Sequence, residues 1–85
     1  MFKVIIHKGA VKDLEKLKQV NLSEKVKNIV KELKINPYCK PVEKLKGNLK
    51  GFYSKRINIQ HRLVYKIDPD ENIVIIVSMW SHYGD

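Results

Sequence analysis

The stretch Ile73-Val74-Ile75-Ile76-Val77 consists only of β-branched apolar residues. Successive side chains of a β-strand point to opposite faces of a sheet, so an apolar residue at every position requires cover on both faces. We therefore expect residues 73–82 to form a central strand. Its neighbours should be the strand that precedes it in the chain and, on the other side, a short N-terminal strand over residues 3–7.

Two strands upstream of this run complete an antiparallel meander. The sequence Pro69-Asp70-Glu71-Asn72 is rich in turn-forming residues and joins a strand over residues 61–68 to the last strand. Another strand, over residues 51–58, comes before it. If the paired residue numbers of this first hairpin sum to 118, Arg56 lies opposite Arg62 on one face. A shift of one residue would place the two arginines on opposite faces.

Between the first strand and this meander, apolar residues recur with helical spacing. We expect a short helix over residues 10–20, where every third residue from Val11 is apolar, and Asn21 should end it. The second helix has the stronger pattern, carried by Leu22, Val26, Ile29, Val30 and Leu33. Asn21 and Glu24 have the spacing of a capping box at its start, and Asn36-Pro37 should end it.

The expected order of elements is β-α-α-β-β-β in a single domain of residues 1–85. This order gives an α+β fold, in which a helical hairpin packs on one face of a twisted, mainly antiparallel sheet. Residues 37–50 contain two prolines, one glycine and several lysines, and we interpret most of them as an ordered loop. Long ordered loops commonly carry function.

The charge is unevenly distributed along the chain. The 17 lysines and arginines outnumber 9 acidic residues and give a formal net charge of +8. All of this excess lies in residues 1–50, and it favours a nucleic acid or an acidic protein as partner. Arg56 and Arg62 are the only arginines. A guanidinium grips phosphate or carboxylate through two parallel hydrogen bonds, so these positions mark a candidate anion site.

The sequence also argues against several classes of protein and site. No stretch approaches the roughly 20 apolar residues of a membrane helix, and the first residues lack the pattern of a secretory signal, so we expect a cytoplasmic protein without membrane contact. Cys39 is the single cysteine, which rules out an internal disulfide. The three histidines lack metal-ligand spacing, and we expect neither a metal nor another cofactor.

The remaining candidates are Glu43 in the lysine-rich loop, the two arginines, and His82-Tyr83 after the last apolar run. Like charges directly opposite in a sheet repel, and an anion between two arginines would explain such a pair better than stability does. The ordinary pKa of histidine, about 6.5, suits proton transfer at neutral pH. The arginines and Glu43 could instead be ordinary solvated charges, and His82 an ordinary terminal histidine. Trp80 could stack on a base or pack in the core.

Four segments in the C-terminal half occur in a distinctive order and spacing. They are Pro41-Val42-Glu43-Lys44-Leu45-Lys46, Gly51-Phe52-Tyr53-Ser54-Lys55-Arg56-Ile57, His61-Arg62-Leu63-Val64-Tyr65 and His82-Tyr83. Together they closely resemble the YoeB/Txe toxins of the RelE/ParE superfamily. The N-terminal half is similar to that superfamily only in its order of elements, a strand followed by a helical hairpin. The resemblance implies a RelE-like fold.

The resemblance further implies the toxin of a toxin-antitoxin module. Such a toxin is an endoribonuclease, or mRNA interferase, that cleaves messenger RNA in the ribosomal A site by attack of the 2′-hydroxyl, without a metal. The implied roles are general base for Glu43, phosphate and transition-state clamps for Arg56 and Arg62, general acid for His82, and orientation of the substrate for Tyr83. This chemistry suits these residue types, because a base, cations and an acid are what the reaction requires.

Two lysines and two departures from the family pattern complete the implied site. Lys46 and Lys55 would add positive charge around the phosphate. Lys55 stands where the family usually has arginine, which keeps the charge but weakens a two-pronged contact. Gly84-Asp85 extends past the tyrosine at which the family often stops, so a carboxylate would lie close to His82.

The implied partners are an acidic antitoxin of the YefM/Phd type, the 70S ribosome with its messenger RNA, and a second copy of the chain, as is common among close relatives. Two other functions remain open. One is a ParE-like inhibitor of gyrase, which would not need Glu43, Arg62 and His82 together. The other is a non-catalytic RNA- or ribosome-binding module, in which the lysines supply nearly all of the affinity through phosphate neutralisation.

Overall fold

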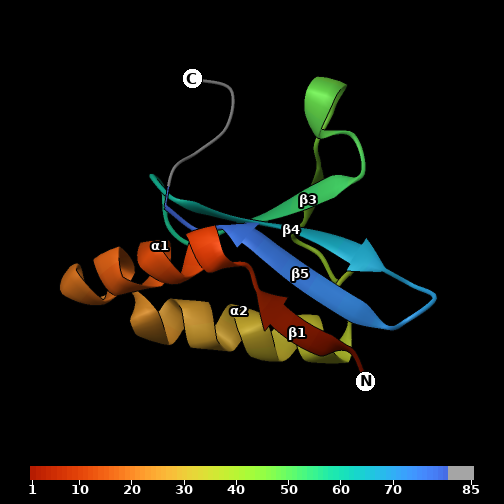
Figure 1. The fold of residues 1–85 in the computed structure, drawn as a ribbon. Coiled ribbons are helices and arrows are strands. Elements are labelled where there is room, and N and C mark those ends of the chain that lie inside the picture. The colour runs from red at the N-terminus through yellow and green to blue at the C-terminus, as the bar shows by residue number, and fades with distance from the viewer. Residues whose placement is uncertain (81–85) are drawn as a thin grey trace.

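The computed structural model of the protein describes residues 1–80 and places two helices on one face of a five-stranded sheet (Figure 1). The helices are α1 (Lys8–Gln19) and α2 (Ser23–Ile35). The strands are β1 (Lys3–Ile6), β2 (Glu43–Lys44), β3 (Phe52–Arg56), β4 (Arg62–Asp68) and β5 (Ile73–Ser78), and a 3-10 turn, η1 (Gly47–Leu49), lies between β2 and β3. The expected α+β fold is confirmed.

The strands are arranged in the order β1-β5-β4-β3-β2. β5 lies between the parallel β1 and the antiparallel β4, which confirms the central position expected for the apolar run. Val74 and Ile76 of β5 are completely buried in the core. The register between β3 and β4 pairs Arg56 with Arg62, which is the first of the two registers that the sequence left open.

Two boundaries differ from the expectation. Residues 37–50 are not a loop throughout, because Glu43 and Lys44 pair with β3 as an edge strand. Two residues without apolar alternation leave no periodic signal, so the sequence pattern does not reveal β2. β5 ends at Ser78, whereas we expected a strand to residue 82. Met79 is buried in the core, and its backbone N–H donates to Asp13 Oδ2 of α1 at 3.1 Å.

The core fills the space between the helices and the covered face of the sheet. α2 contributes Val26, Ile29 and Leu33 at the spacing of one helical face. The other buried apolar residues of this cluster are Ala10, Leu17, Ile57, Leu63, Tyr65, Val74, Ile76 and Met79. Burying a large aliphatic side chain is worth roughly 1.5–3 kcal/mol. Packing therefore holds both helices on the sheet.

The turn between the helices centres on Asn21 and is not the capping box predicted from Glu24. α1 ends in a Schellman motif, in which the N–H of Leu22 donates to Leu17 O at 2.9 Å and that of Asn21 to Lys18 O at 3.2 Å. Asn21 has a φ of 61°, a left-handed conformation that asparagine adopts more readily than most residues. α2 starts without a side-chain cap, because this backbone conformation commits Asn21 to closing α1.

Side chains of the sheet hold the segment between α2 and β2, residues 36–42. Tyr65 is completely buried, and its hydroxyl donates to Pro37 O at 2.7 Å. Its ring stacks on Tyr53 with centroids 5.8 Å apart, and Tyr38 packs edge-on against Tyr53 at 6.1 Å. Burial raises the pKa of Tyr65, and nearby Tyr53 adds to the effect, so the phenol stays protonated and keeps donating.

This raised pKa predicts a loss of stability in alkali that depends on Tyr65. The unfolded chain releases the phenolic proton near the ordinary pKa of about 10, while the folded chain retains it, so the free energy of unfolding falls as the pH rises above about 10. Tyr65→Phe should lower the free energy of unfolding by about 1 kcal/mol at neutral pH. Between neutral pH and about pH 11, the free energy of unfolding should then fall less in this variant than in the wild type. Urea unfolding at both pH values measures the difference, and parallel losses would contradict it.

Candidate active site

The candidate active site lies on the open face of the sheet, opposite the helices. Side chains alternate along β3, so Lys55 faces α2 while Ser54 and Arg56 face away from it. Glu43 of β2 pairs with Ser54, and Arg62 of β4 pairs with Arg56. Directly paired residues of antiparallel strands project on the same face, so the pairing collects the four side chains on the open face.

These side chains border a cleft of about 260 Å³. Its lining consists of Pro41, Val42, Glu43, Ser54, Arg56 and Arg62. The cleft therefore combines three residues that the sequence analysis proposed with three that it did not. Ser54 is 2% exposed. It would have been found from the alternation of β3, because it lies two residues before Arg56.

The connection through η1 brings Glu43 alongside β3. Gly47 and Gly51 have φ values of 67° and 95°, where a side chain would be strained. The N–H of Leu45 donates to Phe52 O at 2.9 Å, and that of Lys50 to Gly47 O at 3.1 Å. These bonds fold the chain back on itself immediately after β2 and fix the register of Glu43 against Ser54.

An ion pair joins the candidate general base to one arginine. Arg62 Nη1 donates to Glu43 Oε2 at 2.9 Å. The Arg62 side chain is 25% exposed and that of Glu43 is 60% exposed, so solvent and a substrate reach the carboxylate. With Arg56 directly opposite Arg62, the cleft holds two guanidinium groups and one carboxylate. The net charge of these three groups is +1, which favours an anion in the cleft. The Glu43 carboxylate would then lie beside that anion as a base.

The structure corrects the assignment of Lys55 to the phosphate site. Lys55 is 4% exposed. Its Nζ donates to Cys39 O at 2.7 Å and to Pro41 O at 3.1 Å. The correction follows from strand alternation, since the residue next to Arg56 must face the helices. An anion on the open face does not reach this buried ammonium.

The other predicted residues are Lys46, His82 and Tyr83. Lys46 is exposed at the start of η1 and lines a neighbouring hollow with Lys44 and Lys50. It does not line the cleft, and its contribution to the phosphate site stays a prediction. His82 and Tyr83 lie outside the described residues, and their roles stay predictions.

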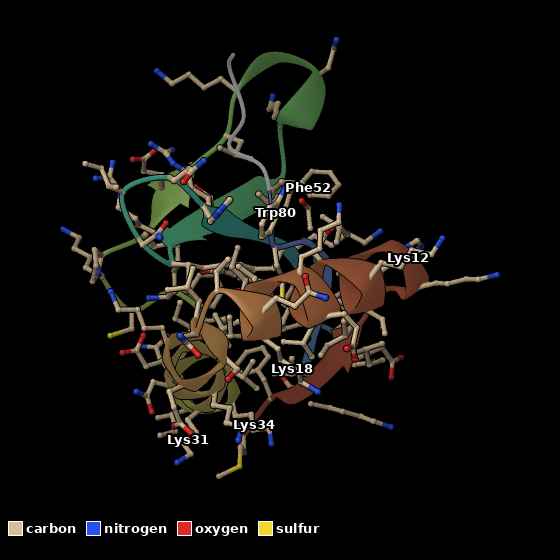
Figure 2. All side chains as sticks on the ribbon, turned by 90° about the vertical axis from the view of Figure 1, so that its left-hand side faces the viewer. Lys12, Lys18, Lys31, Lys34, Phe52 and Trp80 are labelled. Carbon is tan, nitrogen blue, oxygen red and sulfur yellow. The ribbon has the colours of Figure 1, made fainter. Side chains whose placement is uncertain are left out.

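Close to the cleft, a stacked pair of rings ends the described chain. His61, next to Arg62, is 7% exposed and stacks on Trp80 with ring centroids 4.2 Å apart, and its Nδ1 contacts the backbone oxygen of Trp80. Lys16 Nζ of α1 lies 5.4 Å from the centre of the Trp80 ring, and Figure 2 shows Trp80 above α1. Trp80 thus packs on protein groups, and it does so two residues before His82. Nothing in the sequence pattern indicated this stacking of His61.

Two kinds of feature are absent from the part of the chain that the structure describes. Neither helix within residues 1–80 is long and apolar enough to cross a membrane. The same residues bring together no group of three or more His, Cys, Asp or Glu that would hold a metal ion.

Fold and site together define a small basic α+β domain with a carboxylate and two guanidinium groups on its open sheet face. The model of a known family, the YoeB-like toxins of bacterial type II toxin-antitoxin systems, matches residues 7–83. The chain belongs to this family of toxins. Its organisation of strand, helical hairpin and meander is therefore the organisation of a type II toxin.

Individual relatives agree with this assignment. Toxin YoeB of Synechocystis sp. is 39% identical over 74 residues, which cover 84% of this chain and 76% of that protein. Toxin YoeB of Escherichia coli O6:H1 is 40% identical over 63 residues, 71% of each chain. A chain of the YoeB-YefM complex from Staphylococcus aureus superposes with a TM-score of 0.80 at 34% identity, covering 98% of this chain and 99% of that one. The YoeB toxin of that organism is also described as a dimer.

The exposure of the Glu43–Arg62 pair predicts that it contributes little to stability. Exposed ion pairs are worth about 0–1 kcal/mol. We expect Glu43→Gln and Arg62→Ala each to change the free energy of unfolding by less than about 1 kcal/mol in urea. A loss of several times that amount from either variant would show that the pair is structural.

Proposed function

We propose that this toxin is a metal-independent endoribonuclease that cleaves messenger RNA in the A site of the ribosome. The observation that carries the proposal is the Glu43–Arg62 ion pair at 2.9 Å, with Arg56 directly opposite, on the open face of the sheet. A base beside two phosphate-binding cations supplies what strand cleavage by a ribose 2′-hydroxyl requires. Membership of the YoeB-like toxins supports the same activity.

In the proposed reaction the RNA provides its own nucleophile. Glu43 takes the proton of the 2′-hydroxyl, and the oxygen attacks the adjacent phosphorus. Arg56 and Arg62 stabilise the negative charge that builds on the phosphoryl oxygens in the transition state. The bond to the 5′-oxygen breaks, and the products are a 2′,3′-cyclic phosphate and a 5′-hydroxyl. The resemblance supports His82 as the donor of the proton to the leaving oxygen and Tyr83 as a residue that orients the substrate.

The ion pair has a further consequence for this reaction. In the protein alone, Glu43 and Arg62 satisfy each other. A guanidinium has five N–H donors, so Arg62 can turn donors toward a phosphate that enters the cleft. The Glu43 carboxylate then exchanges a hydrogen bond from Arg62 for one from the 2′-hydroxyl. Substrate binding in this way places the carboxylate against the proton that it removes.

The lysines support the ribosome as the place of cleavage. The whole net charge of +8 lies in residues 1–50. Figure 2 shows Lys12, Lys18, Lys31 and Lys34 extending from the helices into solvent. Ribosomal RNA presents a dense array of phosphates, and neutralising them releases counterions and gives affinity without sequence preference. In this proposal the lysines of the helical side attract the ribosome, and the cleft on the open face of the sheet carries out the cleavage.

An acidic antitoxin is the second proposed partner, and a groove on the helical side supports it. This groove of about 440 Å³ has an apolar floor of Ile6, Leu14, Val26 and Val30. Its rim carries Lys18, Lys27, Lys31 and Lys34. An amphipathic helix with an acidic polar face complements such a surface in both respects. A relative forms a complex with the antitoxin YefM, and another structure of it is a dimer, so a second copy of the chain is a third proposed partner.

The catalytic proposal predicts that variants of the cleft lose cleavage without losing ribosome binding. Glu43→Gln or Arg62→Ala should lower the single-turnover rate on ribosomes carrying a defined messenger RNA by at least about a hundredfold. A messenger RNA with a single 2′-deoxyribose at the cut position should resist cleavage, since the nucleophile is missing. Lys66→Ala, an exposed change on β4 outside the cleft, serves as control. Cleavage of the deoxy substrate, or a wild-type rate for both variants, would refute the reaction.

The groove predicts a charge-dependent affinity for the antitoxin. Lys27→Glu combined with Lys31→Glu should weaken binding of the cognate antitoxin by about tenfold or more and reduce its salt dependence. Lys12→Glu combined with Lys25→Glu changes the net charge equally but avoids the groove. Titration calorimetry of both double variants separates the two effects. Equal weakening would place the contact elsewhere.

A further inference from the structure

A lysine ammonium is buried beneath the sheet, directly behind the candidate cleft. Lys55 is 4% exposed. Lysine is almost never this buried unless its charge is matched by partners. Here Nζ donates to Cys39 O at 2.7 Å and to Pro41 O at 3.1 Å, and Glu32 Oε1 of α2 lies 3.6 Å away. Two of the three N–H donors of the ammonium are therefore hydrogen-bonded to backbone oxygens, and the nearby Glu32 carboxylate balances its charge.

The two backbone oxygens belong to the segment that leads to Glu43. Pro41 and Val42 line the cleft and are followed at once by β2. β2 has only two residues and lies at the edge of the sheet, so its own pairing with β3 is short. A residue that fixes Cys39 and Pro41 therefore has strong influence on where Glu43 stands. Lys55 ties this backbone both to β3 and, through Glu32, to α2.

We propose that Lys55 is a positioning residue, whose buried ammonium holds the Cys39–Pro41 backbone so that the Glu43 carboxylate meets Arg62 in the cleft. The inference rests on the proposed function for its consequence in catalysis. Neighbouring residues of β3 then place one cationic side chain on each face of the sheet. Arg56 faces the substrate, and its neighbour Lys55 holds the segment that delivers the base. One strand in this way sets the distance between the phosphate clamp and the base.

The proposal predicts a loss of rate without a loss of binding. Lys55→Met fills the same space but has no donors, so two part-buried carbonyl oxygens lose their partner and the segment shifts. Misplacement of a catalytic group by about 1 Å costs about a hundredfold in rate. We expect a fall of that order in the single-turnover rate constant on ribosomes. The toxin concentration at half-saturation should stay near that of wild type, because Arg56 and Arg62 are unchanged.

Two control variants separate positioning from general stability. Tyr65→Phe removes another buried donor to the same segment, at Pro37, six residues before Glu43. It should lower the melting temperature and leave the rate constant close to wild type. Lys55→Arg keeps a buried cation with donors and should recover most of the rate. If Lys55→Met does not fold, Lys55→Gln, which retains one donor group, takes its place in every comparison.

A double variant tests whether Lys55 acts through Glu43. In the Glu43→Gln background the base is already missing, so adding Lys55→Met should cause no further loss of rate. The same fold loss in both backgrounds would overturn the proposal. So would failure of Lys55→Arg to recover activity while it folds normally.

Hydrogen exchange gives a readout that does not depend on cleavage. In Lys55→Met the amide of Leu45, which donates to Phe52 O, should exchange faster, while amides of β4 and β5 keep wild-type rates. Unchanged exchange at Leu45 would overturn the positioning role whatever the activity. Faster exchange in a protein whose wild type cleaves no messenger RNA would refute the proposed function and leave the anchoring of β2 by Lys55 in place.

Discussion

Burial of one face of the sheet by α1 and α2 fixes the register of its long strands. A slip of one residue in β4 would turn Leu63 and Tyr65 away from the core, at the cost of two buried side chains. The same constraint determines what the open face carries. With Tyr65 and Leu63 held in the core, Arg62 must project outward, and its pairing with Arg56 follows. Apolar packing on one side of the sheet thus arranges charges on the other.

The polar connection between α2 and β2 is the part of the fold that apolar packing does not explain. Its backbone carbonyls at Pro37, Cys39 and Pro41 accept hydrogen bonds from Tyr65 and Lys55. Both donors come from the covered face of the sheet and are buried. An unpaired buried carbonyl costs about 1–3 kcal/mol. Tyr65 holds the start of this irregular segment against the core at Pro37, and Lys55 holds its end at Cys39 and Pro41, directly before β2.

The lysines and the arginines lie on different sides of the molecule and have different proposed roles. The helical side carries exposed lysines around an apolar groove, where weak, long-range attraction acts on a partner. The cleft holds two arginines, and in the proposed function their planar donors contact one phosphate. Because the Glu43–Arg62 pair is exposed, we expect it to add little to stability, which would leave the two side chains free to exchange partners in the proposed reaction.

The sequence by itself determined the features that repeat along the chain. The branched run at 73–77 predicted the central strand, and helical spacing predicted α1 and α2. The sequence left two registers open for Arg56 and Arg62, and the pairing of β3 with β4 decided between them. Only the tertiary structure revealed β2, the burial of Lys55 and the stacking of His61 on Trp80. The physical reason for this difference is how far apart along the chain the interacting residues lie. Periodicity records whether a side chain meets core or solvent. A buried polar contact depends on a partner 14 to 19 residues away, which only the folded chain brings into reach.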